Sequence, residues 1–182
     1  MSEPMREDEF LEKNSRMVYN LALRLVGNPA DAEDLAQDAL IRALKALPAF
    51  RGDSSQSTWV YRITLNTWKN RVRSEKRRSF WKTLPLHFLF GEDGSEEKSL
   101  PAEDPPLDAG LETEETSRLV QKALLELDED SRTVVVLREI EGLSYDQISQ
   151  TLGLPEGTVK SRLSRARDAL KAKLSNFAKA GG

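Results

Sequence analysis

The sequence SYDQISQTLGLPEGTVKSRLSRARDAL, residues 144–170, contains two short helical patterns on either side of a turn. Ser144 and Gln147 have the spacing of a capping box, in which each side chain accepts a hydrogen bond from the other residue's backbone N–H. Gly142 and Gly153 stand where successive helices would end. These signals predict a helix-turn-helix, whose second helix enters the major groove of DNA.

Apolar residues on both sides of this turn have the spacing of two crossed helices. They recur at intervals of three and four residues, as the buried sides of two packed helices require. They are Ile148, Leu152, Leu154, Val159, Leu163, Ala166 and Leu170. The small side chain of Ser149 lies where the two helices would approach closely.

The other side of the second helix is polar and basic. Its outward positions and their neighbours are Lys160, Ser161, Arg162, Ser164, Arg165, Arg167 and Asp168. Such a face suits a major groove, where side chains contact bases and phosphates. A basic helix alone would more simply be a solvated surface. Here the cap, the turn, the spacing and the charge agree, which favours DNA binding.

Composition indicates a globular protein and excludes several kinds of site. The 182 residues are 38% hydrophobic and 31% charged, which suits two small domains. Without cysteine the chain forms no disulfide or thiolate zinc site, and its one histidine, His87, excludes a histidine-rich metal site. We expect no membrane span, because no apolar run approaches about 20 residues. We also expect no signal peptide and no cofactor. The expected location is the cytoplasm.

The net charge of −3 hides strong local charges. Residues 62–78 hold seven Lys and Arg against one acid, and residues 160–173 hold six against one. Residues 79–116 hold ten Asp and Glu against two Lys, together with four of the eight prolines. We therefore expect two local DNA-binding faces and a flexible acidic linker between them. The apolar residues 80–81 and 84–90 of this linker either dock elsewhere or belong to the first domain's core.

The first 50 residues contain two amphipathic helical patterns. Apolar residues from Phe10 to Leu25 recur with helical spacing, and the sequence Gly27-Asn28-Pro29 ends that helix. Asp31 is expected to cap the next helix, which runs to Leu47 with one apolar stripe. The other faces of this helix carry Asp34, Gln37, Asp38 and Arg42.

A loop and a long basic helix follow. Residues 50–57, FRGDSSQS, are expected to form a loop because of their Gly, Asp and Ser content. A third helix begins near Ser57 and turns Trp59, Val60 and Ile63 inward. One stripe along its outer side consists of Arg62, Asn66, Lys69, Arg73 and Arg77. A helical hairpin needs no such stripe, although a solvated face would explain it equally well.

Two further helices are expected before the helix-turn-helix. Apolar residues from Leu119 to Leu127 indicate the first, and residues 134–140 indicate the second. Three consecutive valines in the second also fit a β-strand, but Gly142 and the capped helix after it leave no strand partner in view. The predicted fold is all-α, with a first domain, a linker and a second domain at residues 1–79, 80–116 and 117–182.

The chain resembles a group IV, extracytoplasmic-function sigma factor, a promoter-recognition subunit of bacterial RNA polymerase. Residues 31–44, DAEDLAQDALIRAL, resemble the polymerase-binding helix of region two, and residues 50–63, FRGDSSQSTWVYRI, resemble its melting segment. Residues 66–78, NTWKNRVRSEKRR, resemble the helix that faces the minus-ten element. Residues 137–170 resemble region four, which reads the minus-thirty-five element.

This resemblance implies a non-catalytic initiation factor that directs core RNA polymerase to promoters and helps to open the duplex. The minus-thirty-five element would contact Lys160, Ser161, Ser164, Arg165, Arg138, Arg162 and Arg167. The minus-ten element and the melted strand would contact Phe50, Asp53, Ser54, Ser55, Gln56, Arg62, Asn66, Lys69 and Arg73. Core polymerase would contact Asp34, Gln37, Asp38 and Arg42. The family also implies an anti-sigma factor as a partner, and a role in a stress or envelope response.

Two rival hypotheses use the same helix-turn-helix. A stand-alone transcriptional regulator would leave the motifs in residues 31–78 unexplained. A recombinase-type enzyme would need a nucleophile or a carboxylate cluster. The sequence shows no Ser-His-Asp set, phosphate-binding glycine loop or metal-ligand cluster, so we expect no enzymatic activity.

Overall fold

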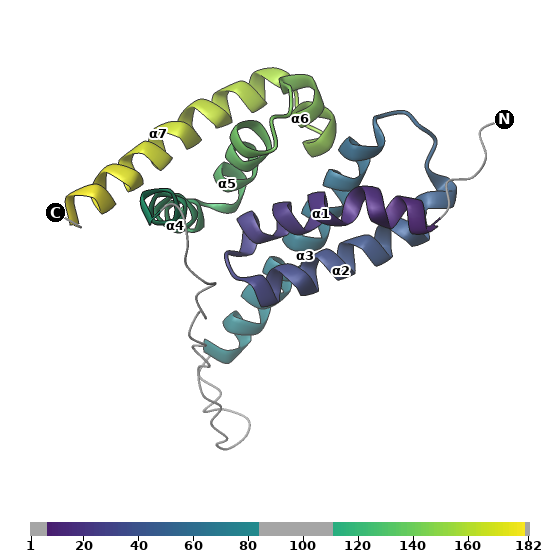
Figure 1. The fold of residues 1–182 in the computed structure, drawn as a ribbon, viewed down its shortest axis with the longest axis horizontal. Coiled ribbons are helices and arrows are strands. Elements are labelled where there is room, and N and C mark those ends of the chain that lie inside the picture. The colour runs from purple at the N-terminus through teal and green to yellow at the C-terminus, as the bar shows by residue number, and fades with distance from the viewer. Residues whose placement is uncertain (1–6, 84–110, 181–182) are drawn as a thin grey trace, which may run out of the picture.

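The computed structural model describes residues 7–83 and 111–180. Within these residues every regular element is helical and no strand is present, which confirms the predicted all-α class. The helices are α1 (Glu7–Val26), α2 (Pro29–Ala46), α3 (Gln56–Thr83), α4 (Leu111–Leu125), α5 (Glu129–Val135), α6 (Tyr145–Leu152) and α7 (Glu156–Ala180). Figure 1 shows α1, α2 and α3, purple to teal, beside α4 to α7, green to yellow.

Helices α1, α2 and α3 share an apolar core, because each turns one apolar stripe inward. Phe10, Leu21 and Leu35 are fully buried, and burial of each such side chain stabilises the fold by about 1.5 to 3 kcal/mol. Trp59 of α3 meets Phe10 of α1 edge to face, with ring centroids 6.4 Å apart. These contacts fix α2 and α3 so that their polar sides face outward.

The turn before α2 corrects the expectation that Asp31 caps this helix. Asn28 is the N-cap, and its side-chain oxygen accepts a hydrogen bond from the Asp31 N–H at 2.9 Å. Pro29 takes the first helical position, where its missing N–H leaves no hydrogen bond unmade. Asp31 instead lies within the first turn, where a carboxylate interacts favourably with the helix dipole.

The ends of the expected linker are helical. Helix α3 continues to Thr83 and α4 begins at Leu111, whereas the sequence indicated a break in periodicity from Ser79 to Thr116. Lys, Arg and Glu are good helix formers, so a helix can continue here without an apolar stripe. The apolar residues 84–90 of the expected linker lie outside the described residues.

Helices α6 and α7 form the predicted helix-turn-helix. The capping box is present in both directions: Ser144 Oγ accepts from Gln147 N–H at 3.1 Å, and Gln147 Oε1 accepts from Ser144 N–H at 2.8 Å. Gly153 ends α6 in the left-handed conformation, with φ of +65°. Ile148 and Leu163 are buried between the helices, as predicted.

The valine run is helical, as predicted, but its second part is a wider helix. Helix α5 ends at Val135, and Val136–Ile140 form a single π-helical turn in which Glu141 N–H donates to Val136 O at 3.0 Å. Asp128 caps α5 by accepting a hydrogen bond from Ser131 N–H at 2.9 Å. The valine side chains remain buried, so the wider turn does not interrupt the core.

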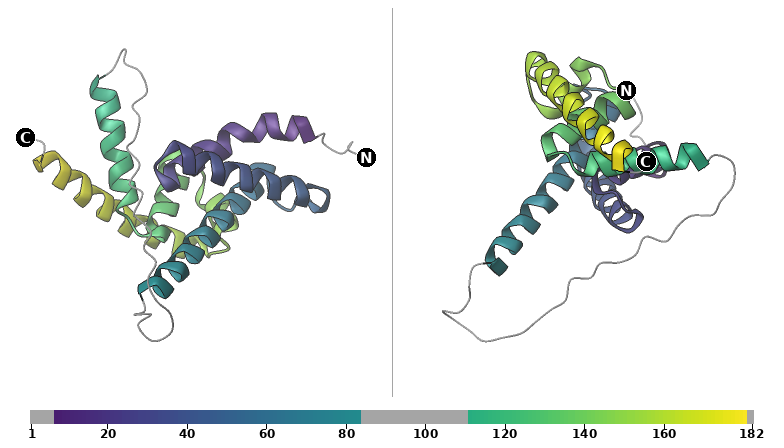
Figure 2. Two further views of the ribbon diagram at one scale, coloured as in Figure 1. Left: turned by 90° about the horizontal axis from the view of Figure 1, so that it is seen from below. Right: turned by 90° about the vertical axis from the view of Figure 1, so that its left-hand side faces the viewer.

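The two halves of the chain pack against each other. Helix α3 contacts α6, and α1 contacts α4 and the π-helical turn. Figures 1 and 2 show α5 and α6 between α7 and the first three helices. One cluster of buried side chains continues across the contact, with Leu25 and Trp68 on one side and Leu124 and Leu137 on the other.

Candidate nucleic-acid and protein interfaces

The outward face of α7 presents three residues predicted to read bases. Val159 and Leu163 are buried against the rest of the helix-turn-helix, which turns Ser161, Ser164 and Arg165 outward, where all three are exposed. Arg165 donates from Nε to the carbonyl of Ser161 in its own helix, at 3.3 Å. The guanidinium can leave this long bond for a base edge without breaking any packing.

Tyr145, the first residue of α6, lies beside two further cations predicted to bind DNA. The Lys160 ammonium lies 5.3 Å from the Tyr145 ring centroid and pairs with Glu156 at 3.2 Å. The Arg138 guanidinium lies 4.7 Å from the same centroid and donates to the Leu143 carbonyl at 2.7 Å. Arg138 is thus held by its own half of the chain, and phosphate binding by this residue stays a prediction.

The other two predicted phosphate-binding arginines form ion pairs. Arg167 donates to Glu139 Oε1 from Nη2 at 2.6 Å and from Nε at 2.9 Å, and this hydrogen bond raises the pKa of the Arg167 guanidinium. Arg162 donates to Asp130 Oδ2 at 2.9 Å. Both pairs are partly exposed, and exposed ion pairs are weak, so a phosphate can replace either carboxylate.

The predicted basic stripe lies along one side of α3. Leu65 and Trp68 are buried on another side, while Lys69 is half-buried, and the exposed members are Arg62, Asn66, Arg73 and Arg77. Two members contact the second half of the chain. Arg62 Nη2 donates to the Gln150 carbonyl at 2.5 Å, and Lys69 Nζ pairs with Asp130 at 3.1 Å.

Phe50, predicted to meet the melted strand, packs on a neighbouring aromatic ring. Its centroid lies 4.9 Å from that of Trp59, and Phe50 is half-buried. Gly52 has φ of +76° with open space around it, so the backbone turns sharply before α3. The loop therefore begins at a pair of packed aromatic rings.

The polar residues of this loop divide into a structural group and an outward group. Ser55 Oγ accepts a hydrogen bond from Thr58 N–H at 3.1 Å and lies 2.8 Å from Thr58 Oγ1, so Ser55 caps α3. Asp53 is exposed at the tip, and Ser54 and Gln56 are half-buried. Because Gln56 Oε1 is buried and Ser55 caps α3, Asp53 and Ser54 are the loop residues best placed to meet a ligand.

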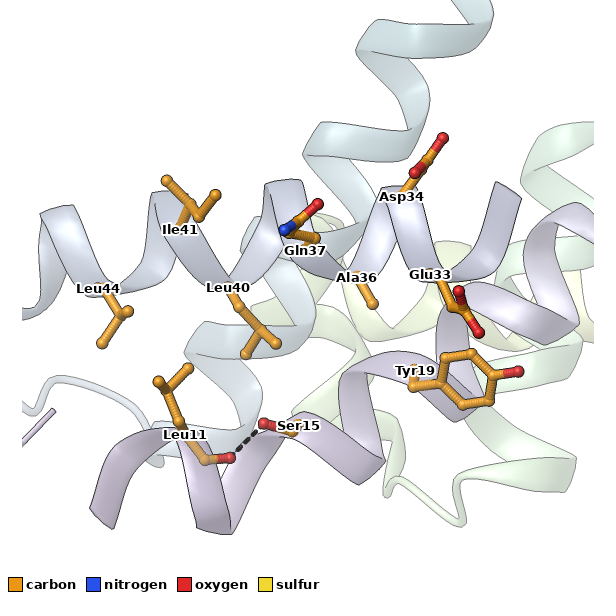
Figure 3. A pocket seen from close by; sticks show the side chains of 10 residues that line it. All are labelled: Leu11, Ser15, Tyr19, Glu33, Asp34, Ala36, Gln37, Leu40, Ile41 and Leu44. Carbon is orange, nitrogen blue, oxygen red and sulfur yellow. Dashed lines mark hydrogen bonds between the residues drawn. The ribbon is translucent and has the colours of Figure 1, made fainter. Parts of the chain in front are cut away.

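A groove of about 540 Å³ runs between α1 and α2. Figure 3 shows Leu40 and Leu44 of α2 turned toward Leu11 of α1, with Asp34 and Gln37 on the rim. Its wall also includes Ile41, which is 43% exposed. An apolar floor with a polar rim is typical of a protein-binding surface.

Two of the four residues predicted to bind polymerase line this groove, namely Asp34 and Gln37. Asp38 instead pairs with Arg71 of α3 at 3.0 Å, and Arg42 is exposed outside the groove lining. Sequence reasoning missed the apolar part of the surface. The signal was Ile41, an isoleucine between the polar residues Asp38 and Arg42 on a face expected to be hydrophilic.

The described residues contain neither a cluster of metal-ligand side chains nor a long apolar helix. Within residues 7–83 and 111–180, no three His, Cys, Asp or Glu side chains gather closely enough to hold a metal ion. None of the helices in those ranges has the length and hydropathy to cross a membrane.

Two family models match the chain, and they coincide with its two halves. Sigma-70 region 2 matches residues 10–78, and Sigma-70, region 4 matches residues 117–170. The RNA polymerase sigma-H factor of Pseudomonas aeruginosa is 36% identical over 166 residues, 90% of this chain and 83% of that protein. The ECF RNA polymerase sigma-E factor of Escherichia coli K12 is 38% identical over 157 residues, 86% and 80% of the two chains.

Two solved structures resemble the fold over most of its length. The sigma factor RpoE of Bartonella quintana, in complex with the anti-sigma factor NepR, aligns with a TM-score of 0.63 at 27% identity, over 92% of this chain and 96% of that one. CnrH in complex with the cytosolic domain of CnrY aligns with a TM-score of 0.59 at 26% identity, over 97% of this chain and 89% of that one.

Proposed function

Because the chain belongs to the extracytoplasmic-function sigma factors of bacterial RNA polymerase, we propose that it places core polymerase on promoters by binding two DNA elements with its two halves. It is an initiation factor and not an enzyme, since polymerisation is carried out by the core. The observation that carries the proposal is the helix-turn-helix with an exposed polar face on α7, preceded in the same chain by a region-two match.

Each half of the chain is assigned its own functions. We assign polymerase binding, minus-ten recognition and melting to residues 1–79, and minus-thirty-five recognition to residues 117–182, with residues 80–116 as the linker. Exposure on α7 supports base contacts by Lys160, Ser161, Ser164 and Arg165. Phosphate contacts are assigned to Arg138, Arg162 and Arg167, the first of them on the π-helical turn and the other two on α7.

Footprinting with and without core polymerase tests this proposal. A sigma factor is expected to protect both promoter elements when core polymerase is present and much less when it is absent. A stand-alone regulator, the alternative, would protect its site equally well alone. Equal footprints in the two experiments would therefore favour the regulator.

The groove between α1 and α2 is proposed to receive core polymerase. Asp34→Lys should weaken co-purification with core enzyme, because it reverses a charge at the rim of this groove without touching the core. Glu12→Lys is a matched control, since Glu12 is exposed on α1 and does not line the groove. Equal losses for the two variants would count against this assignment.

The loop before α3 is proposed to hold one unstacked base of the non-template strand. Extruding a base costs a few kcal/mol, which stacking and hydrogen bonds in the loop must return. Asp53 and Ser54 are changed together to glycine, and Ser55 is kept because it caps α3. Permanganate reactivity of promoter thymines should fall while the closed complex persists. Normal reactivity at a normal rate would contradict the melting role.

Partners and location follow from the family. The structural neighbour RpoE is a sigma factor bound to the anti-sigma factor NepR, which supports an anti-sigma factor that covers the polymerase-binding groove here. Core polymerase is the other protein partner and promoter DNA the ligand. We place the protein in the cytoplasm, where the polymerase works, and assign it to a stress or envelope response.

A further inference from the structure

The ring of Tyr145 lies beside cations from two elements of the second half. Tyr145 is the first residue of α6, is half-buried and packs against the apolar core. The guanidinium of Arg138, on the π-helical turn, lies 4.7 Å from its ring centroid, and the ammonium of Lys160, on α7, lies 5.3 Å from it. At such distances the negative face of an aromatic ring attracts a cation. One ring therefore holds two of the residues proposed to contact the minus-thirty-five element.

A third cation proposed to contact this element lies close to the phenol of Tyr145. Arg167 donates to Glu139 Oε1 at 2.6 and 2.9 Å. The hydrogen bond to Glu139 is the main cause of the raised pKa of the Arg167 guanidinium, and Tyr145 adds to that rise. Tyr145 is thus a neighbour that Arg138, Lys160 and Arg167 share. These three cations and Tyr145 form the Tyr145 cluster.

Two glutamates balance the positive charge of the Tyr145 cluster. Glu156 Oε2 pairs with Lys160 Nζ at 3.2 Å, and Glu139 pairs with Arg167. Cations gathered around one ring repel each other, and the ring and the two carboxylates offset this repulsion. The cations are therefore held together at a spacing that the protein sets before DNA arrives.

The two cations on the ring keep donors for DNA. A lysine ammonium has three N–H donors, and an arginine guanidinium has five. Lys160 pairs with one carboxylate, and Arg138 donates from Nη1 to the Leu143 carbonyl at 2.7 Å. The remaining donors can meet a phosphate or a base edge, so the ring contacts need not break when DNA binds.

The Tyr145 cluster is formed within the second half of the chain, since its members lie in residues 138–167. The contact between the halves uses other residues. Arg132 Nη1 donates to the Leu25 carbonyl at 2.6 Å, and Gly27 makes room for the Leu125 side chain, with which a Cβ would collide. One half alone therefore supplies every member of the cluster.

We infer that Tyr145 is a positioning residue for minus-thirty-five recognition, whose ring holds Lys160 and Arg138 in place for DNA without contacting DNA itself. The inference rests on the proposed function of α7. Long cationic side chains lose rotamer freedom when they bind, and a contact that orders them beforehand lowers this cost. Each exposed cation–π contact changes an equilibrium by about two- to fivefold.

Affinity of the holoenzyme for a selected duplex gives the first measurement. The duplex carries a minus-thirty-five sequence that the wild-type holoenzyme selects from a random pool. Tyr145→Phe keeps the ring and should bind within about twofold of the wild type. Tyr145→Leu keeps an apolar side chain but no ring, and should bind several-fold more weakly, up to about 25-fold, the product of two such factors. The inference is overturned if Tyr145→Leu binds like the wild type, or if Tyr145→Phe binds as weakly as Tyr145→Leu, because the hydroxyl would then be what matters.

A thermodynamic cycle shows whether Tyr145 acts through the two cations. Tyr145→Leu is made again in a chain that carries Lys160→Met and Arg138→Met, which keep the apolar stems of both side chains. In that chain its effect should fall below about twofold, because the cations through which it acts are gone. A folding defect does not depend on these cations. An equal loss in both backgrounds would therefore give Tyr145 a purely structural role and overturn the inference.

An unrelated sequence in place of the selected minus-thirty-five sequence separates this inference from the proposed function. If α7 reads this element, the exchange should weaken binding of the wild-type holoenzyme, and so should Lys160→Met with Arg138→Met on the selected duplex. A wild-type holoenzyme that is indifferent to the exchange would remove the proposed function, and the inference with it. Normal discrimination by the wild type, together with no coupling between Tyr145 and the cations, would overturn the inference alone.

Discussion

The two proposed DNA-binding faces differ in how the molecule presents them. On α7, buried Val159 and Leu163 hold the helix, and the side chains proposed to read bases are exposed. On α3, the cations Arg62 and Lys69 are engaged by α6 and α5 of the other half. One face is therefore complete within its own half, whereas access to the other depends on how the halves are arranged. A helical surface can thus be fully formed while some of its side chains are engaged by another part of the chain.

The largest expected effect comes from disrupting the packing that holds α7 within its own half. Leu163→Ala removes a side chain that is 1% exposed between α7 and the rest of its half, and should lower the free energy of unfolding by about 2 to 5 kcal/mol. Urea denaturation followed by circular dichroism measures this loss. Ser164→Ala, on the exposed side, should stay within about 0.5 kcal/mol of the wild type. Equal stabilities would mean that the packing of α7 is not what presents its outer face.

The second effect breaks the contact between the two halves of the chain. Arg132→Ala leaves carbonyl groups at the ends of α1 and α4 without their donor, which should cost about 1 to 3 kcal/mol in unfolding free energy. Burial lowers the pKa of the Arg132 guanidinium, a sign that water is partly excluded around it. Arg132→Lys keeps the charge but not the planar fork, so it should restore only part of the stability. Full rescue by lysine would show that charge alone matters.

A third prediction separates the two faces by the kind of binding they supply. Arg165→Ala should weaken binding to the preferred promoter by about 1 to 3 kcal/mol and relax selection at one base pair. Arg62→Ala should weaken binding to all promoters to a similar extent and reduce the salt dependence, because it removes a proposed phosphate contact. Affinities of the two holoenzymes for a set of single-base promoter variants give the answer. A selectivity change with Arg62→Ala would reverse the assignment.

The smallest expected effect concerns the helix caps of the two halves. Hydrogen bonds from the Ser131 side chain and then from its backbone N–H lower the pKa of the Asp128 carboxyl. A folded pKa below the unfolded value means that this stabilisation is present above the unfolded pKa and is lost as pH falls through the folded pKa. Asp128→Asn should therefore flatten the acid side of the stability profile. Asn28, the neutral cap of α2, should add no such dependence.

The parts of the fold that the sequence predicted correctly have local causes. Ser144, Gln147 and Gly153 lie within one short segment, and each fixes its neighbours by its own hydrogen bond or backbone angle. The wrong cap at Asp31 has an equally local cause, because an asparagine directly before a proline competes for the same position. Local rules were sufficient where a single residue satisfies the rule, and failed where two neighbouring residues compete for one position.

The contact between the halves had no local cause to reveal it. Lys69 and Asp130 are 61 residues apart. The spacing of exposed charged residues along the sequence does not indicate which of them will pair. Arg132 looked like any surface arginine of a short helix, yet it donates to carbonyl groups in both halves. The role of Ile41 in the groove was missed for a similar reason, since a single apolar residue on a polar face does not predict a groove. These features depend on which surfaces meet in three dimensions.

The close approach of Gly27 to Leu125 has a consequence for how this chain can change over time. At position 27 the backbone has φ of +86°, and any side chain there would collide with the leucine of the other half. A smaller residue 125 would remove the collision but not the backbone strain, because an L side chain rarely adopts this φ. Residue 27 should therefore stay glycine among descendants, even where residue 125 becomes smaller.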